Sequence, residues 1–424
     1  MLKLAKVYLW LLWIVPTLIF LGAPSSISLV IFFIPIVFGI LKINMIATIL
    51  PIWAVAFFML LTALSSFFGD VPIANVLISY SLILQFAFGF ALVTNLTFDQ
   101  FRSLLHQLNY LCYFQVSIAI VQIFVWKRPG DSINGSMLGD PHGTNILTFL
   151  LFLTLLLNWE FKNLSAKNMA IALTVCIFIG IEADAKIVLL SSAIFALLLS
   201  VTKIVGKRIS LSTKLTALVS AITLTVLVMA SGIPQYARIH WSSEINSALS
   251  SKSLILKEVS SSRTSYGLEN SILIGAGPTQ TVSRSAIIAE SIYPKTESLS
   301  TLRVSQPKYY SQFIQTTGKF NVGPISSVAQ PLSSIVGLIA DYGILGSLML
   351  IFLYFIPVFK RIHHSSVGRK TIPLLLCLFL VPLSYFNTFL EFPQAVFPFV
   401  IALHGMTFSK KNFTKKNAIS IHVV

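Results

Sequence analysis

Long apolar runs alternate with short polar connections along most of the chain. A helix needs roughly 20 mostly apolar residues to cross the hydrocarbon layer of a membrane, which is about 30 Å thick. Runs that approach this length predict transmembrane helices near 7–23, 27–42, 45–68, 71–93, 108–126, 144–159, 169–182, 187–203, 214–233, 333–358, 371–389 and 393–409. We therefore expect an all-α polytopic membrane protein with about 12 transmembrane helices.

One long polar segment interrupts this pattern. Residues 234–332 are rich in serine and separate predicted helices 1–9 (residues 1–233) from helices 10–12 (residues 333–409). Apolar residues within this segment are spaced as in short amphipathic helices that lie against a bundle. Residues 410–424 form a basic tail. The sequence thus predicts one large loop between helices 9 and 10.

Composition and the placement of charge agree with a membrane protein. Hydrophobic residues make up 55% of the chain and charged residues only 10%, against roughly 25% charged residues in an ordinary soluble domain. The net charge of +16 could indicate nucleic-acid binding, but 18 of the 30 basic residues lie in segments that would share one side of the membrane. Because short basic loops stay in the cytoplasm, we expect both termini there, an extracytoplasmic 234–332 loop and no nucleic-acid partner.

The N-terminal segment and the cysteines add further expectations. Lys3 and Lys6 precede an apolar run without an evident cleavage site, which is typical of a retained signal-anchor helix. Cys112, Cys176 and Cys377 each lie in an apolar stretch, so we expect no disulfide framework. The sequence also shows no spacing typical of a metal site, and no metal is expected.

The predicted outer loop carries an excess of positive charge. Nine basic residues, among them Arg263, Arg284 and Arg303, stand against five acidic ones, which leaves a net charge of +4. The cytoplasmic bias of basic residues does not explain charge outside the cell, so an anionic ligand is the better explanation. The aromatic residues of the loop could stack on sugar rings, or could form an interfacial belt or a small core.

Two short connections on the predicted outer side carry ionisable groups. In residues 127–145, Asp140 and His142 are candidate proton acceptors, although an Asp-Pro turn followed by a helix cap explains them equally well. In the second connection, Asp184 and Lys186 lie between apolar runs, where ionisable groups are costly unless they pair or line a wet cavity. Lys186 either neutralises a neighbouring carboxylate or faces an anion at the mouth of the bundle.

A third candidate site lies in the long loop, where Arg263 precedes the glycine-containing segment 268–280. Gly275 and Gly277 would let the backbone approach a ligand closely, although a short Gly-x-Gly-Pro sequence usually forms an ordinary turn. No kinase, Walker or dinucleotide-binding signature surrounds these glycines, which argues against nucleotide chemistry.

Four segments resemble, in order, motifs of the bacterial O-antigen polymerase and ligase superfamily. They are the turn Gly135–Asn145, with His142 where the family usually has Asn; Asp184-Ala-Lys186, in place of a Ser-Arg motif; Arg263 with Gly275-Ala-Gly277-Pro278; and Asp341-Tyr-Gly343-Ile-Leu-Gly346. With the predicted spans and loop, the resemblance covers nearly the whole chain. Ligases of the family carry a His just before the tenth span, where this chain has none, and this departure favours polymerisation over ligation.

The resemblance implies a polymerase on the outer face of the bacterial cytoplasmic membrane, which joins oligosaccharide repeat units into O-antigen, capsule or exopolysaccharide. A hydroxyl group of one unit would attack the anomeric carbon of a chain carried on undecaprenyl pyrophosphate. The sugar–phosphate bond already holds the driving force, so no cofactor is expected. The implied partners are undecaprenyl-pyrophosphate-linked oligosaccharides and the lipid bilayer, with a flippase and a chain-length regulator as further candidates.

This reaction needs positive charge at the departing pyrophosphate, and guanidinium groups supply it in bidentate form. The candidate groups for pyrophosphate or glycan are Arg263 first, then Lys186, Arg284 and Arg303, with the backbone of Gly275 and Gly277. The candidate general bases are Asp140, His142 and Glu290.

Two other functions stay open. A ligase that transfers glycan to lipid A or protein would use the same donor. A polysaccharide flippase or secondary transporter also has about 12 spans, but it should show similar halves and charges near the middle of the membrane. Here the charges gather at one face. A purely structural scaffold would explain the topology but not the outer basic excess.

Overall fold

The computed structural model describes most of the predicted helical part of the chain. The described residues are 1–21, 50–128, 130–137, 143–161, 164–205, 273–296, 303–311, 333–364, 371–386 and 389–406, with isolated positions elsewhere. Of these residues, 82% are helical and none forms a strand. The predicted all-α class is therefore confirmed for the described part of the chain.

Most of the elements are α-helices, and most of these helices follow the apolar runs of the sequence. They are α1 (Leu2–Phe20), α4 (Ile52–Gly69), α5 (Ile73–Val93), α6 (Phe98–Ile120), α7 (Gly143–Phe161), α8 (Ala166–Glu182), α9 (Lys186–Val205), α12 (Arg284–Thr296), α14 (Ser334–His364), α15 (Thr371–Phe386) and α16 (Pro393–Gly405). Short elements are the π-helix η2 (Val121–Val125) and the 3₁₀-helices η3 (Gly130–Ser132) and η5 (Phe389–Glu391).

Several of these helices have the length and composition of membrane spans. Among the described residues, Phe98–Val125, Gly143–Phe161 and Ser334–Phe359 could each cross a membrane, and the two halves of α5 could form a fourth, bent span. The predicted spans 27–42 and 214–233 lie outside the described residues, apart from isolated positions in the first. The total of twelve spans and the outer position of the long loop stay predictions.

Helix α6 begins at Phe98, well before the span predicted at 108–126. A capping box explains this start, because Thr97 Oγ1 accepts from the Gln100 N–H while the Gln100 side chain accepts from the Thr97 N–H. The first turns of α6 are amphipathic, so the apolar run from which the span was predicted does not include them. Similarly, α14 continues to His364, past the predicted end at residue 358.

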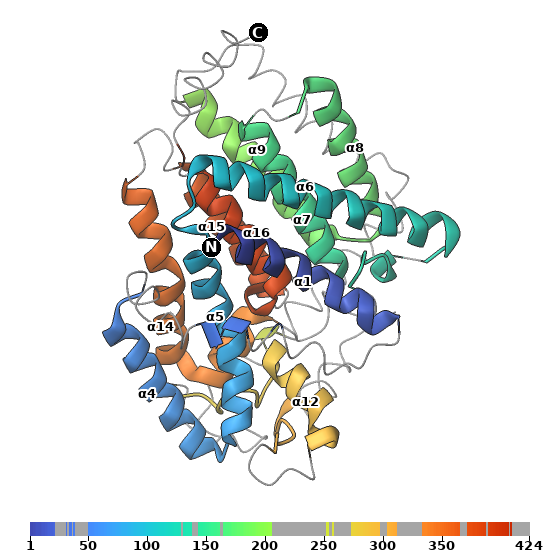
Figure 1. Cartoon of the computed structure of the whole chain (residues 1–424). Coiled ribbons are helices and arrows are strands. Elements are labelled where there is room, and N and C mark those ends of the chain that lie inside the picture. The colour runs from blue at the N-terminus through green and yellow to red at the C-terminus, as the bar shows by residue number, and fades with distance from the viewer. Residues whose placement is uncertain are drawn as a thin grey trace.

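Helix α16 forms the centre of the bundle (Figure 1). All its residues are buried, and it packs against α5, α7 and α1. Helices α6, α8 and α9 surround α7, and α15 lies against α9. One continuous hydrophobic core joins the first and last described helices. The three cysteines, Cys112, Cys176 and Cys377, are buried and form no disulfide.

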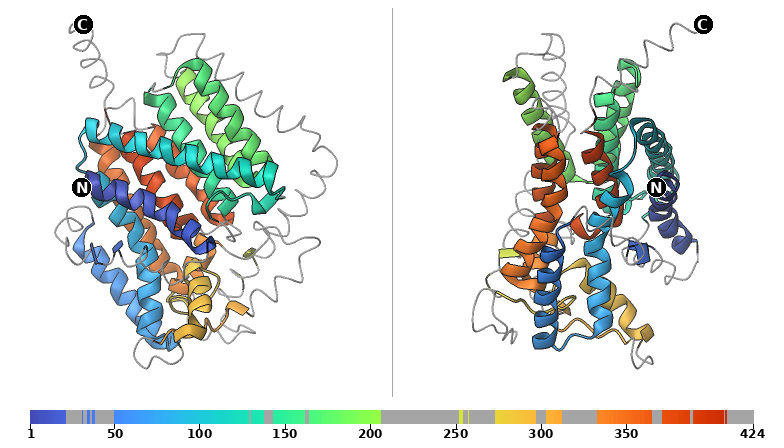
Figure 2. Two further views of the ribbon diagram at one scale, coloured as in Figure 1. Left: turned by 45° about the vertical axis from the view of Figure 1, so that its right-hand side comes forward. Right: turned by 60° about the vertical axis from the view of Figure 1, so that its left-hand side comes forward.

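The loop-derived helix α12 lies at one end of this bundle, beside the turn that joins α4 to α5 (Figure 2). Helix α12 packs against α5, and α4 packs against α14. Two segments that are distant in sequence, residues 273–283 of the long loop and the first turns of α14, meet at this end.

Candidate functional site

Helix α14 is interrupted at Gly343, where the backbone turns to φ 68° and ψ −178°. The loop segment 273–283 runs along this break and hydrogen bonds to it. The N–H of Ala276 donates to the carbonyl of Ala340 (2.8 Å), and the N–H of Gly277 donates to the carbonyl of Asp341 (2.9 Å). The loop thereby satisfies two carbonyl groups of the helix just before the break.

The close contact requires glycine on both sides. A Cβ atom at Gly275, whose φ is +81°, would lie 2.3 Å from the Gly343 nitrogen, and one at Gly343 would lie 2.3 Å from the Leu273 carbonyl oxygen. No side chain fits at these distances. The predicted close approach at Gly275 and Gly277 is thus an approach to α14, and ligand binding by their backbone stays a prediction.

The carboxylate of Asp341 fastens the loop to α14. The side chain is fully buried, and its two oxygens accept four hydrogen bonds from loop residues. Oδ1 accepts from the Thr281 N–H (2.9 Å) and hydroxyl (2.7 Å), while Oδ2 accepts from the Thr279 N–H (3.1 Å) and the Ser283 hydroxyl (2.6 Å). The charge is compensated by these donors, so Asp341 acts as a fixed anchor for this unit.

A chain of hydroxyl groups continues from this anchor into α5. Ser283 Oγ lies 2.8 Å from Ser285 Oγ, and Ser79 donates to Ser285 Oγ (3.3 Å). Ser79 also hydrogen bonds to the Tyr342 hydroxyl. These bonds satisfy buried polar groups of three helices and hold α5, α12 and α14 in one arrangement.

Glu391 caps the beginning of α12. Its Oε2 atom accepts from the Arg284 N–H (3.0 Å) and its Oε1 atom from the Ser285 N–H (3.5 Å). The Arg284 guanidinium carbon lies 4.2 Å from the Phe392 ring centroid, in a cation–π contact. Burial raises the pKa of Glu391 to about 8; the negative charge of Asp341 adds to the increase, and the hydrogen bond from Arg284 opposes it.

This pKa makes stability depend on pH. Between about pH 4.5 and 8, the folded protein keeps a proton on Glu391 that the unfolded chain releases, so the free energy of unfolding should fall as the pH rises across this range. Glu391→Gln should flatten the dependence. The measurement is the Tm of the micelle-embedded protein from pH 5 to 8.5. The control Glu182→Gln, at an exposed position, should keep the parent's change of Tm with pH. If Glu391→Gln also keeps it, Glu391 is not the group responsible for the pH dependence.

Glu290 lies further along α12, within electrostatic range of Tyr310. Burial raises the pKa of the Tyr310 phenol; the charge of Glu290 raises it further and that of Arg284 lowers it. Glu290 Oε1 accepts from Gln306 Nε2 (3.1 Å). Its Oε2 atom is buried and has no hydrogen-bond partner among the described residues. Of the candidate bases, Glu290 is the one that the structure describes.

Arg303 begins a segment that is tied to α5. The Ser305 N–H donates to Asn75 Oδ1 (2.8 Å), and Asn75 Nδ2 donates to the Ser305 carbonyl (3.1 Å) and to Thr279 Oγ1 (2.7 Å). The side chain of Arg303 is exposed. Gly275, Gly277, Arg284 and Arg303 therefore belong to one hydrogen-bonded unit at one end of the bundle.

The turn around Gly135 is anchored inside the bundle. Gln122 lies in the π-helix η2, and its side chain accepts from the Gly135 N–H (2.9 Å) and donates to the Gly135 carbonyl (2.9 Å). The Gln115 side chain accepts from the Ser136 N–H (2.9 Å). Asp140 and His142 follow this turn but lie outside the described residues.

The Lys186 connection lies next to η3. A Cβ atom at Gly130 would be 3.6 Å from Asp184 Cβ, so the connections near residues 130 and 184 lie next to each other. Lys186 is the first residue of α9, and the structure describes only its backbone. Arg263 lies outside the described residues.

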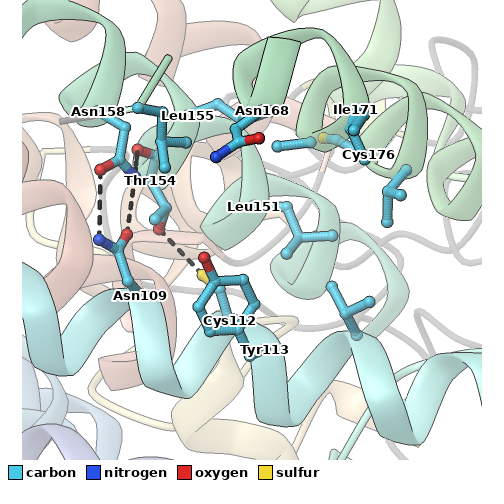
Figure 3. Close-up of a pocket in the computed structure, with 14 residues that line it drawn as sticks. Asn109, Cys112, Tyr113, Leu151, Thr154, Leu155, Asn158, Asn168, Ile171 and Cys176 are labelled. Carbon is cyan, nitrogen blue, oxygen red and sulfur yellow. Dashed lines mark hydrogen bonds between the residues drawn. The ribbon is translucent and has the colours of Figure 1, made fainter. Parts of the chain in front are cut away.

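A separate pocket of about 310 Å³ lies between α6, α7 and α8 (Figure 3). Asn109 and Asn158 exchange amide hydrogen bonds of 2.7 and 3.2 Å, and Cys112 donates to Thr154 Oγ1 (3.1 Å). These polar groups join α6 to α7, and most other lining residues are apolar. None of the predicted site residues that the structure describes lines this pocket.

Sequence reasoning missed Glu391 and the polar face of α5. Asn75 and Ser79 are four residues apart, so they lie on one face of a helix, and this spacing in an apolar run was a usable signal. Within the described part of the chain, no group of three or more His, Cys, Asp or Glu residues could hold a metal ion. No protein-family model matches the chain, and no curated protein matches it significantly.

Proposed function

We propose that the protein is a glycosyltransferase of the bacterial cytoplasmic membrane, with both termini in the cytoplasm. It joins undecaprenyl-pyrophosphate-linked oligosaccharide repeat units into a surface polysaccharide at the outer face. The observation that supports this function best is the direct contact between the Gly275–Pro278 and Asp341–Gly346 segments. Each carries a motif of the O-antigen polymerase resemblance, and Arg284 and Arg303 belong to the same unit.

In the proposed reaction, a hydroxyl group of the acceptor unit attacks the anomeric carbon of the donor chain. The bond between that carbon and the phosphate oxygen breaks, and undecaprenyl pyrophosphate leaves with the bonding electrons. Basic groups stabilise the leaving diphosphate. A general base removes the proton of the attacking hydroxyl, and Glu290 supports this role through its buried, unpartnered Oε2 atom within the described part.

Arg263→Ala tests this function. At unchanged protein level, the variant should reduce polymerisation about 100-fold or more, because one preorganised cation is lost. Cells should then display single repeat units in place of long glycan, measured by gel electrophoresis of surface polysaccharide. Arg238→Ala, in the same long loop but outside the motif, is the matched control. Full-length polymer from Arg263→Ala would refute the role.

A deletion strain separates the polymerase from the ligase. Without a polymerase, the acceptor is still capped with one repeat unit, whereas without a ligase it carries none. The chain lacks the histidine that ligases carry before the tenth span, so we expect the deletion strain to carry one repeat unit on its acceptor.

A further inference from the structure

The pocket between α6, α7 and α8 is separate from the contacts around α12 and α14. Its volume of about 310 Å³ is at the lower end of the roughly 300–1,000 Å³ typical of small-molecule sites. Helices α6 and α7 are long and apolar enough to cross a membrane, and both line the pocket. Helices α6, α7 and α8 lie in the half of the molecule remote from α12 (Figure 1).

The side chains that join α6 to α7 become less polar along the pocket. Asn109 and Asn158 exchange their amide hydrogen bonds at one level. About one turn further along both helices, Cys112 donates to Thr154 Oγ1. Beyond this second pair, the lining residues of α6 and α7 are apolar, namely Val116 and Leu151. The pocket therefore has a polar end near the α7–α8 connection and an apolar end deeper in the bundle.

Helix α8 shows the same change from polar to apolar residues. Asn168 lies in its first turn, and Ala172 and Val175 follow it along the pocket. From Asn168 to Val175 the helix rises about 10 Å. The three lining asparagines gather toward one side of the pocket, whereas Ile171 lies on the other side (Figure 3). All three walls thus fit a molecule with a polar head and an apolar chain.

The mouth of the pocket faces the surroundings of α6 and α8. Tyr113 of α6 and Ile171 of α8 line it and are 61% and 53% exposed. Large exposed apolar surfaces on a membrane protein contact lipid, so a ligand can enter from the bilayer. Among the residues that the structure describes, none that lines the pocket is charged. An ion held there would be costly, which favours an uncharged head.

The polar groups of the pocket suit a head with hydroxyl groups. An amide both donates and accepts hydrogen bonds, as a hydroxyl group does. The Tyr113 hydroxyl and the Asn168 side chain form no hydrogen bond with any residue that the structure describes. Both line the pocket and can bond to a ligand. The volume corresponds to about ten water-sized volumes, which limits the ligand to one hydrocarbon chain.

We propose that this pocket binds an uncharged single-chain lipid whose head carries hydroxyl groups, with monoacylglycerol as the simplest example. The head lies among Asn109, Asn158 and Asn168, and the chain passes Ala172 toward Val175. The inference is independent of the proposed function, because the site lies away from α12 and its binding can be measured without polymerisation.

The test uses the full-length protein in phosphatidylcholine nanodiscs, titrated with radiolabelled monolauroylglycerol. Empty nanodiscs give the non-specific partitioning. Two unlabelled competitors share the 12-carbon chain: dodecyl sulfate has a charged head, and dodecane has none. Dodecyl sulfate should compete at least about tenfold more weakly than unlabelled monolauroylglycerol, because its charge must be desolvated. Dodecane should also compete about tenfold more weakly, because it lacks the hydrogen bonds of the head.

Two pairs of variants locate the binding site. Ala172→Phe should abolish saturable binding, because the ring occupies the pocket, whereas Ala170→Phe, at an exposed position on α8 that does not line it, should bind like the parent. Tyr113→Phe should weaken binding about 2- to 10-fold through the loss of one hydrogen bond. Tyr110→Phe, also exposed on α6 but outside the pocket, is its control.

Tyr113→Phe removes only a hydroxyl group, so it keeps the proposal testable if Ala172→Phe fails to fold. A parent protein without saturable binding would overturn the site. Parent-like affinity in folded Ala172→Phe, or in Tyr113→Phe, would show that the lipid does not bind as proposed. Equal competition by dodecyl sulfate would overturn the uncharged head, and equal competition by dodecane would overturn recognition of any head.

Discussion

Asp341→Asn should lower the free energy of unfolding by about 2–4 kcal/mol, because a buried acceptor of four hydrogen bonds loses its charge and half of its accepting atoms. The carboxamide presents an NH2 group where two donors already point. If the NH2 group replaces Oδ2, the Thr279 N–H and the Ser283 hydroxyl lose their acceptor. If it replaces Oδ1, the N–H and hydroxyl of Thr281 lose theirs. The loop segment 273–283 should separate from α14, and the proposed polymerase activity should fall with it.

The measurement is a thermal unfolding curve of the purified variant, together with limited proteolysis of the loop. Asp99→Asn, in the exposed first turn of α6, is the matched control and should change the unfolding free energy by less than about 1 kcal/mol. A parent-like melting curve and unchanged protease resistance in Asp341→Asn would show that the carboxylate does not anchor the loop.

Gly343→Ala should destabilise the protein by at least about 2–4 kcal/mol, since it combines a positive φ with a steric clash. The new Cβ atom would lie 2.3 Å from the Leu273 carbonyl oxygen. Gly275→Ala should have a similar effect through the Gly343 nitrogen. Because both changes open the same contact, the double variant should lose less stability than the sum of the single variants.

Chemical denaturation of the four proteins in micelles measures this non-additivity. Gly89→Ala is a suitable control, because Gly89 lies inside α5 and its nearest neighbour is the Phe397 side chain at 3.3 Å. That ring can move by a few tenths of an ångström, so a small change is expected. Additive losses for Gly275→Ala and Gly343→Ala would indicate that the two glycines act in separate contacts.

Most of the helices could be predicted from the sequence because they follow apolar runs. The beginning of α6 was missed, since a capping box and an amphipathic first turn carry no apolar run. Within the site, the Gly275 and Asp341 segments were each singled out by resemblance. Their contact was beyond prediction, because local composition does not specify which distant segments pair.

Glu391 illustrates the same limit for charged groups. The sequence neighbours of Glu391 are apolar and do not indicate what it contacts. Its hydrogen-bond donors are the first N–H groups of α12, which are distant in sequence. A buried carboxyl group at a helix N-terminus is recognised only when both segments are placed in space. By contrast, the spacing of Asn75 and Ser79 was present in the sequence and needed only a helical projection.

The interruption of α14 also bears on the stiffness of this helix. The Ala276 and Gly277 N–H groups donate to carbonyls just before Gly343, and the Leu345 N–H after it donates to the Leu273 carbonyl (3.3 Å). The loop segment 273–283 therefore bonds to both parts of α14. A broken helix would otherwise be free to bend at the break, and these bonds hold its two parts at a fixed angle.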